Sequence, residues 1–225
     1  MSAKTNVHAN NVRIRLATPE DKLRLLEYLL EHFRKNEPHE AALQMSREEC
    51  NNWYENVLEA SLKNQPVVSF VALNERDEIV GCRISRTSQS DSKEKTASSI
   101  FGDNTDHTEK FEIFVQFLNK LEEGKEEFLG ASKHLKFELL GVRQDYYGQG
   151  IAKQLVDKGL DAGKAAGCDV VTVFAASFKT QRMFENLYNF QTMRTIQHAE
   201  YLDNGQRVFY CTDGTDCCKL MYKYL

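Results

Sequence analysis

The stretch that decides the fold reads Phe137-Glu138-Leu139-Leu140-Gly141-Val142-Arg143-Gln144-Asp145-Tyr146-Tyr147-Gly148-Gln149-Gly150-Ile151-Ala152-Lys153. Its first part is apolar enough for a buried strand, and its last part begins a helical pattern after two glycines. Glycines let a backbone approach a ligand closely, and the first N–H groups of a helix have no partner within that helix. This turn can therefore hold an anion such as a phosphate or a diphosphate.

Hydrophobic spacing on both sides of this stretch predicts a mixed order of strands and helices. Strands are expected at residues 12–16, 66–73, 79–86, 134–142, 169–175 and 219–225, with a hairpin of 195–202 and 206–211 around Asn204-Gly205. Helices are expected from residue 18 to an exit at 36–38, from 46 to 65, and at 108–128, 148–165 and 180–187, with a polar loop at 85–99. A helix joins the strands at 134–142 and 169–175, so they should be parallel. The predicted fold class is α/β, a mixed central β-sheet with helices on both faces.

Length and composition favour one globular domain. The chain has 225 residues, of which 41% are hydrophobic and 28% charged. We expect a flexible N-terminus at residues 1–11 and a single domain at residues 12–225. The net charge of −4 disfavours nucleic acid as a partner, and the sequence has neither an apolar run for a membrane span nor a signal peptide. A cytoplasmic monomer or homodimer is expected, without nucleic acid or membrane partners.

The six cysteines are expected to be free thiols. A chain of this size needs no disulfide for stability, and the cysteine spacing matches no zinc pattern. The adjacent Cys217 and Cys218 would point to opposite faces of a strand, so they are poorly placed to share one ion. We expect no metal in the functional site.

The glycine turn by itself leaves two interpretations open. A Gly-x-Gly after a strand is as often a tight turn with close helix packing as it is a ligand site. The dinucleotide fingerprint is excluded, because it needs a third glycine and an acidic residue after the next strand, which ends in Val173-Phe174-Ala175. A Walker-type phosphate loop is excluded because the sequence has no Gly-Lys-Ser/Thr triplet.

The run from Tyr147 to Ala152 resembles the acetyl-CoA motif of GNAT acetyltransferases, Gln/Arg-x-x-Gly-x-Gly/Ala, with Gly150 and Ala152 at the two small positions. Tyr147 departs from the motif at its Gln/Arg position, but the backbone amides are unaffected. The resemblance implies the GNAT fold, acetyl-CoA as cosubstrate, and a strand that splays from its neighbour before the turn. It implies cofactor-binding residues at Leu140, Gly141, Val142, Tyr147, Gly148, Gln149, Gly150, Ile151, Ala152 and Lys153, with the Val142 N–H as the oxyanion-hole candidate.

The segment Phe33-Arg34-Lys35-Asn36-Glu37-Pro38 resembles the Phe-x-x-x-Glu-Pro segment of invertebrate arylalkylamine N-acetyltransferases, in which the glutamate is the catalytic base. This base has a defined task, since an ammonium substrate must lose a proton before its nitrogen attacks. The resemblance implies substrate-binding residues at Phe33, Glu37 and Pro38. Apart from it, Glu37 would be interpreted as an exposed carboxylate at a helix end. Four aromatic residues suit either a pocket wall or, more often at helical spacing, the core: Phe33, Trp53, Phe111 and Phe114.

Ser177 and Thr180 precede or begin the last predicted helix and are candidates for catalytic hydroxyls or for helix caps. Phe184 matches the tyrosine that protonates the thiolate in many GNAT enzymes, so the general acid stays unassigned. The resemblance implies direct acetyl transfer from acetyl-CoA to a primary amine, an arylalkylamine such as dopamine, tyramine, octopamine or serotonin, with Glu37 as base. The alternatives are acetylation of a polyamine or another small amine, and a catalytically weak CoA-binding module.

Overall fold

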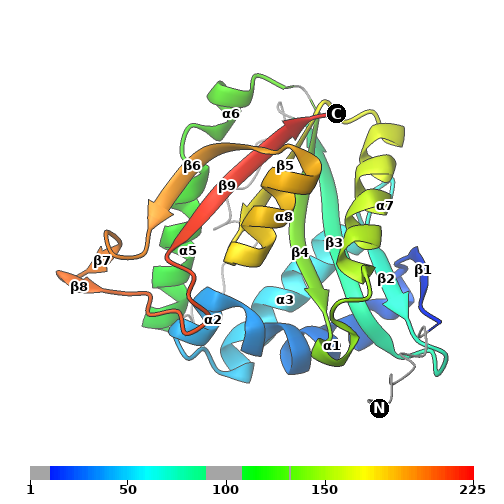
Figure 1. Cartoon of the computed structure of the whole chain (residues 1–225), viewed down its shortest axis with the longest axis horizontal. Coiled ribbons are helices and arrows are strands. Elements are labelled where there is room, and N and C mark those ends of the chain that lie inside the picture. The colour runs from blue at the N-terminus through cyan, green and yellow to red at the C-terminus, as the bar shows by residue number, and fades with distance from the viewer. Residues whose placement is uncertain (1–10, 90–107, 132) are drawn as a thin grey trace, which may run out of the picture.

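A seven-stranded sheet forms the centre of the molecule (Figure 1). The computed structural model describes residues 11–89, 108–131 and 133–225. The strands lie in the order β1 (Arg13–Leu16), β2 (Phe70–Leu73), β3 (Ile79–Gln89), β4 (Lys133–Val142), β5 (Val170–Ala175), β9 (Cys217–Tyr224) and β6 (Gln191–Gln197). β4 and β5 run parallel, and the other neighbouring strands run antiparallel. The predicted mixed sheet and its parallel pair are confirmed.

Helices cover both faces of this sheet (Figure 1). On one face lie α1 (Lys22–Tyr28), α3 (Arg47–Leu62), α5 (Glu109–Glu122) and α6 (Lys125–Leu129), and on the other lie α7 (Ile151–Ala165) and α8 (Phe178–Tyr188). The alternation of side chains along β2 shows the two layers, because successive strand residues point to opposite faces. Val71 and Leu73 pack into the cluster of α1, α3 and α5, whereas Phe70 and Ala72 pack toward α7.

The N-terminal helix is less regular than predicted. Its parts are a 3₁₀ turn at Pro19–Asp21, α1, a π-helical turn at Leu29–Phe33 and a 3₁₀ turn at Arg34–Asn36. The apolar spacing of this helix would also place Leu23 inward, but Leu23 is 75% exposed, and Leu25 and Leu29 fill the core instead. Pro38 does not simply end a helix. It begins α2 (Pro38–Ala42), because Glu37 is extended and caps that helix.

Three other elements also differ from their predicted bounds. The helix expected at 108–128 is broken at Gly124, whose φ of 70° ends α5 and precedes α6. Residues 85–89 of the expected loop continue β3, and residues 90–99 lie outside the described residues, as do residues 1–10 of the expected flexible N-terminus. The Asn204-Gly205 hairpin joins only β7 (Leu202–Asp203) and β8 (Gln206–Arg207), because β6 pairs with β9 instead.

Candidate active site

β4 and β5 separate at their carboxyl ends. Their parallel ladder ends at the pair Phe137 and Val173. Beyond that pair, β5 continues along β9 and β4 continues along β3, with a bulge opposite the Ile84–Ser85 step of β3. The last residues of β4, up to Val142, therefore lack a strand neighbour on the β5 side. This is the splay that the sequence resemblance implied.

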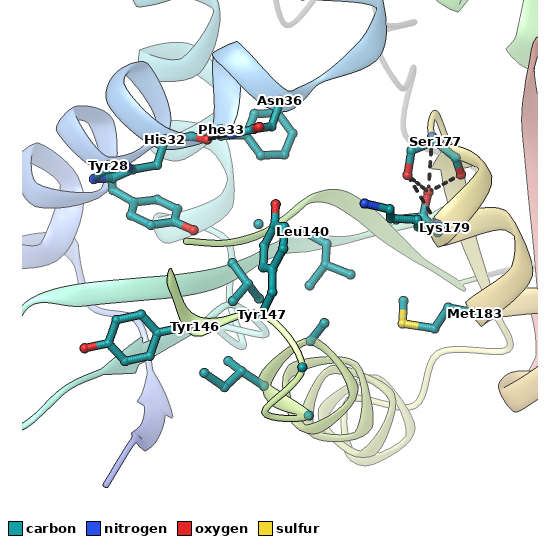
Figure 2. A pocket seen from close by; sticks show the side chains of 17 residues that line it. Tyr28, His32, Phe33, Asn36, Leu140, Tyr146, Tyr147, Ser177, Lys179 and Met183 are labelled. Atoms are coloured by element: carbon teal, nitrogen blue, oxygen red, sulfur yellow. Dashed lines mark hydrogen bonds between the residues drawn. The ribbon is translucent and has the colours of Figure 1, made fainter. Parts of the chain in front are cut away.

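A cavity of about 390 Å³ opens at this separation (Figure 2). Its walls come from α1 and the turns after it, from the end of β4, from the glycine turn with the start of α7, and from the start of α8. The lining residues are Tyr28, His32, Phe33, Asn36, Leu140, Gly141, Val142, Tyr146, Tyr147, Gly148, Gly150, Ile151, Ala152, Ser177, Lys179, Thr180 and Met183. Four predicted site residues lie outside this lining: Glu37, Pro38, Gln149 and Lys153.

The glycine turn has the conformation of an anion cradle. Gly148 and Gly150 have φ values of 77° and 74°, a region that side-chain-bearing residues rarely adopt. A Cβ at either position would meet no protein atom within 4 Å, so the space above them is open. Gly150 is the N-cap of α7 and offers no side chain to the first amides of the helix. These free N–H groups and the open space fit a diphosphate.

The Val142 N–H points toward the gap between β4 and β5. In an antiparallel ladder, residues alternate between bonding to the partner strand and pointing away from it. The Arg143 N–H donates to the Val80 carbonyl at 2.8 Å, and Val142 pairs with Gly81 in the same register. Val142 therefore directs its N–H away from β3, to the side that β5 has left. A donor in that position can stabilise an oxyanion in the cavity.

Gly141 is required by the side chains that face it. A Cβ there would lie 3.0 Å from Cδ2 of Phe33 and 3.3 Å from the hydroxyl of Tyr28. The bulge of β4 is located before Leu139, so Gly141 is not the bulge residue. A glycine is needed here because two aromatic side chains approach the backbone closely. Figure 2 shows Tyr28 and Phe33 on the same side of the cavity.

Ser177 and Thr180 form a reciprocal cap at the start of α8. The Thr180 N–H and the Ser177 N–H each donate to the other residue's hydroxyl at 3.2 Å, and the two hydroxyl oxygens are 3.0 Å apart. The prediction that these residues act as helix caps is confirmed. Both also line the cavity, so a role toward a ligand stays a prediction.

Glu37 is buried at the start of α2 and is not an exposed carboxylate. Its side chain is 10% exposed. One carboxylate oxygen accepts from the Glu40 N–H at 2.7 Å, and the other lies 3.0 Å from Nδ1 of His39. Its chain neighbour Asn36 lines the cavity and accepts from Gln144 at 2.7 Å, whereas Glu37 itself is not part of the lining.

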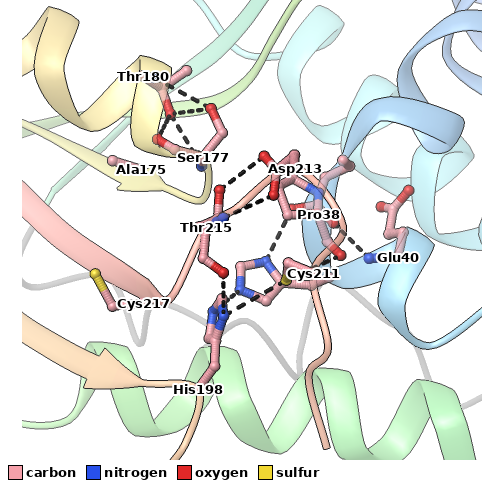
Figure 3. A network of polar contacts seen from close by, with 12 residues as sticks. Pro38, Glu40, Ala175, Ser177, Thr180, His198, Cys211, Asp213, Thr215 and Cys217 are labelled. Atoms are coloured by element: carbon pink, nitrogen blue, oxygen red, sulfur yellow. Dashed lines mark hydrogen bonds and ion pairs between the residues drawn. The ribbon is translucent and has the colours of Figure 1, made fainter.

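Sequence reasoning missed the polar network around Glu37. Its other members are His39, Glu40, His198 and Thr215 (Figure 3). They come from α2 and from two segments more than 150 residues farther along the chain, so no local pattern could have connected them. Burial and Glu37 raise the pKa of Glu40 well above its usual range, which favours the neutral form of this carboxyl.

Of the four candidate aromatic residues, only Phe33 lines the cavity. Trp53, Phe111 and Phe114 are buried in the core, as their helical spacing favoured. Sequence reasoning also missed the lining residues Tyr28, His32, Lys179 and Met183. The ammonium of Lys179 lies 5.9 Å from the ring centre of Tyr147 and brings a positive charge near the motif position that Tyr147 occupies.

Tyr188 is an unsuitable source for a proton in the cavity. Its hydroxyl is 2.8 Å from Oδ1 of Asp157 and 3.1 Å from the carbonyl of Lys153, both on α7. Burial and Asp157 raise the pKa of this phenol above its usual range. Tyr188 therefore holds α8 against α7, and Phe184 beside it is fully in the core.

The parallel strand pair splays before a glycine turn, and the N–H at the end of the first strand is directed into the gap. The acetyltransferase (GNAT) family matches residues 24–190. This match covers most of the chain. The protein belongs to the GNAT family and is an N-acetyltransferase of amines, and members of this family use acetyl-CoA.

Solved structures share this fold over nearly the whole chain. Arylalkylamine N-acetyltransferase 2 from Aedes aegypti superposes with a TM-score of 0.84 at 22% identity, covering 96% of this chain and 99% of that one. Drosophila melanogaster polyamine N-acetyltransferase, which forms N-acetylagmatine, gives a TM-score of 0.78 at 21% identity, covering 96% and 100%. An agmatine N-acetyltransferase variant gives 0.81 at 20% identity, covering 96% and 100%. At these identities the similarity establishes the fold.

The described residues contain neither a cluster of metal-ligating side chains nor a helix suited to span a membrane. In those residues, no group of three or more His, Cys, Asp or Glu side chains could hold a metal ion. Cys217 and Cys218 contact opposite sides of the sheet, with Cys217 beside Gln181 of α8 and Cys218 in the cluster of α1, α3 and α5. None of the described helices is long and apolar enough to cross a membrane.

Proposed function

We propose that this protein acetylates a primary arylalkylamine, such as dopamine, tyramine, octopamine or serotonin, and that it works in the cytoplasm. The observation that carries this proposal is the composition of the cavity. Aromatic rings of Tyr28, Phe33, Tyr146 and Tyr147 stand around it, and none of the described residues in its lining is an aspartate or a glutamate. An aromatic wall suits a ring and its attached ammonium, whereas a second cationic end would lack a partner.

The glycine turn and β4 would hold the acetyl donor, which is a substrate here. The free amides at the start of α7, from Gly148 to Ala152, would bind its diphosphate, and Lys179 would add a positive charge. The unpaired edge of β4 at Leu140 and Val142 would bind the arm that leads to the thioester. The Val142 N–H would stabilise the oxyanion that forms during attack.

Glu37 would act as the general base. A primary amine is mostly an ammonium ion at neutral pH and cannot attack until it loses a proton. Because Glu37 is not part of the cavity lining, the proton would reach it through water. Phe33 and Pro38 would fix the substrate beside this base, and Ser177 and Thr180 would border the other side of the cavity.

The first test compares amines. Release of free CoA should be fastest with tyramine, dopamine and serotonin, and slow with spermidine and agmatine. Faster turnover of spermidine or agmatine would support the alternative of polyamine or small-amine acetylation. Absence of turnover with all amines, despite tight CoA binding, would instead support a CoA-binding module.

The second test addresses the base. Glu37→Gln keeps the size of the side chain and removes its basicity, so kcat/KM with the best amine should fall by about a hundredfold or more. Glu31→Gln, an exposed position on the same part of the chain, serves as the matched control and should retain wild-type turnover. Equal turnover of Glu37→Gln and wild type from pH 6 to 9 would remove Glu37 from the mechanism.

A further inference from the structure

Four polar groups form one line that begins at Glu37. His39 Nδ1 lies 3.0 Å from Oε1 of Glu37, and His39 Nε2 lies 3.0 Å from Nε2 of His198. His198 Nδ1 lies 3.2 Å from the carbonyl oxygen of Thr215 (Figure 3). His39 is 1% exposed and His198 0%, so these contacts take the place of hydrogen bonds to water.

The carbonyl at the end of the line favours one arrangement of the protons over the reverse, in which the Cys211 thiol, 3.6 Å away, would donate to His198 Nδ1. A carbonyl oxygen can only accept, so His198 carries its proton on Nδ1 and its Nε2 is an acceptor. His39 must therefore donate from its own Nε2. The remaining atom of His39, Nδ1, then faces a carboxylate oxygen of Glu37, which also only accepts. The line is complete only when one additional proton lies between Glu37 and His39.

This requirement gives an additional proton a defined place between Glu37 and His39. Without the additional proton, two buried acceptor atoms would face each other at 3.0 Å, which is unfavourable. With it, every contact is a hydrogen bond, and the proton can lie on an imidazole, whose ordinary pKa of about 6.5 exceeds the carboxylate value of about 4.3. Burial and the neighbouring His39 lower the pKa of His198 to about 4, so His198 stays neutral and remains an acceptor.

We propose that His39 receives the proton that Glu37 removes from the amine, and that His198 holds His39 in the orientation for this transfer. The proposal rests on the function proposed above. An N–H bond of the ammonium breaks, water carries the proton to Glu37, and an N–H bond forms at Nδ1 of His39. The proton returns to solvent after the acetylated product has left. His39 does not touch the substrate but acts through Glu37, so it is a positioning residue, as is His198.

The environment favours the protonated form of Cys211 and Glu40, the thiol and carboxyl groups that flank this line. Burial and then Glu37 raise the pKa of Glu40, and its carboxyl accepts from the hydroxyl of Tyr54. Burial and then Asp213 raise the pKa of Cys211 to about 11, so the thiol beside His198 stays protonated and donates to the Pro38 carbonyl. The other ionisable groups that act on the line are Arg34, Tyr54, Arg207, Asp213, Asp216 and Cys218.

The test replaces His39, the proposed proton acceptor, by a residue that can still form the hydrogen bond to Glu37 but cannot be protonated. In His39→Asn, the amide nitrogen can still donate to Glu37 but cannot take up a proton. The acidic limb of kcat/KM against pH should move down by about one unit or more, and the high-pH plateau should fall about tenfold or more. His134→Asn is the matched control, because His134 is also buried and bonds a carbonyl, that of Ala131, away from the cavity. The acidic limb of kcat/KM against pH should be the same in His134→Asn as in the wild-type protein.

A second measurement uses only the wild-type protein, so its result does not depend on whether a variant folds. Imidazole nitrogen spectra should show His39 taking up a proton with the midpoint of the kinetic limb, while His198 stays neutral with its proton on Nδ1. An unmoved limb in a folded His39→Asn protein, or a His39 that does not titrate over that range, would overturn the proposal. Glu37→Gln separates the two failures. If it keeps full turnover, the base assignment itself is wrong, and if it is inactive while His39→Asn keeps the limb, only the role of His39 is wrong.

Discussion

The two sides of the cavity are built in different ways. The proposed donor side is one contiguous stretch, from Leu140 to Ala152, and it would work through main-chain groups. The proposed amine side extends beyond the cavity lining through the side chains of Glu37 and His39 at the start of α2 and of His198 after β6, and it ends at the main-chain carbonyl of Thr215 before β9. A site that binds through main-chain amides tolerates a different side chain at a motif position, such as Tyr147 in place of Gln or Arg, because the amide is still present. The amine side depends on each side chain, because the loss of one leaves its partner buried and unpaired.

The largest expected effect of a single substitution on the donor side comes from Gly150→Asp. The new carboxylate would lie at the start of α7, where it would cap the first amides itself and repel the diphosphate. The dissociation constant for CoA should rise about hundredfold, or about 3 kcal/mol, measured by calorimetric titration.

Gly167→Asp is the control for that experiment. Gly167 follows α7 with a φ of 72°, close to the 74° of Gly150, and a Cβ there also meets no atom within 4 Å. Both variants should lose about 1 kcal/mol of folding stability from the left-handed conformation. Only Gly150→Asp should lose affinity for CoA. Equal affinity in the two variants would show that the turn does not bind the diphosphate.

A smaller effect is expected where the two sides meet, in Gly141→Ala. The added methyl would lie 3.0 Å from Phe33 and 3.3 Å from the Tyr28 hydroxyl, so the Phe33 ring must move within the cavity. KM for an arylalkylamine should rise about fivefold to tenfold, which corresponds to about 1 kcal/mol, while CoA affinity changes little. Steady-state kinetics with both substrates varied would measure the two values.

Gly159→Ala separates this specific effect from general crowding. Gly159 lies in α7 with its Cβ direction 3.1 Å from the ring of Phe137, a contact as close as that of Gly141 but inside the core. Its folding stability should change by up to about 2 kcal/mol, since overpacking opposes the better helix propensity of alanine. Its KM for the amine should stay at the wild-type value. A raised KM in both variants would mean that crowding alone accounts for the effect.

The donor side could be predicted from the sequence because its information is local. The glycines, the apolar strand before them and the helical pattern after them lie within 17 consecutive residues, and each obeys a rule about backbone conformation. The parallel pairing of β4 with β5 followed from the helix between them. Gln149 and Lys153 were included by position in the motif, but neither lines the cavity, and the ammonium of Lys153 pairs with Asp157 at 2.7 Å.

The amine side could be predicted only in part. The sequence motif identified Glu37, but it could not predict that Glu37 is buried. Burial depends on segments far away in the sequence that fold over this residue. A continuous helix was expected from residue 18 to an exit at 36–38, and helical spacing of apolar residues gives no indication of the π-helical turn at Leu29–Phe33. That turn shifts the register of the chain just before Glu37. The contact between His39 and His198 could not be predicted, because no sequence pattern connects two residues that are 159 positions apart.

The smallest effect is expected from substitutions of the hydroxyls at the edge of the cavity. They test whether each hydroxyl only stabilises the start of α8 or also takes part in the reaction. Ser177→Ala removes the oxygen that accepts from the Thr180 N–H at 3.2 Å, so folding stability should fall by about 1 kcal/mol and the melting temperature by about 2–4 °C. Thr180→Val removes the reciprocal acceptor and should cost a similar amount. If these hydroxyls serve mainly as caps, kcat should change less than about threefold in both, since neither group then takes part in proton transfer. A tenfold loss of kcat in Ser177→Ala with an unchanged melting temperature would instead assign Ser177 to the reaction, and the donor side would then depend on a side chain as the amine side does.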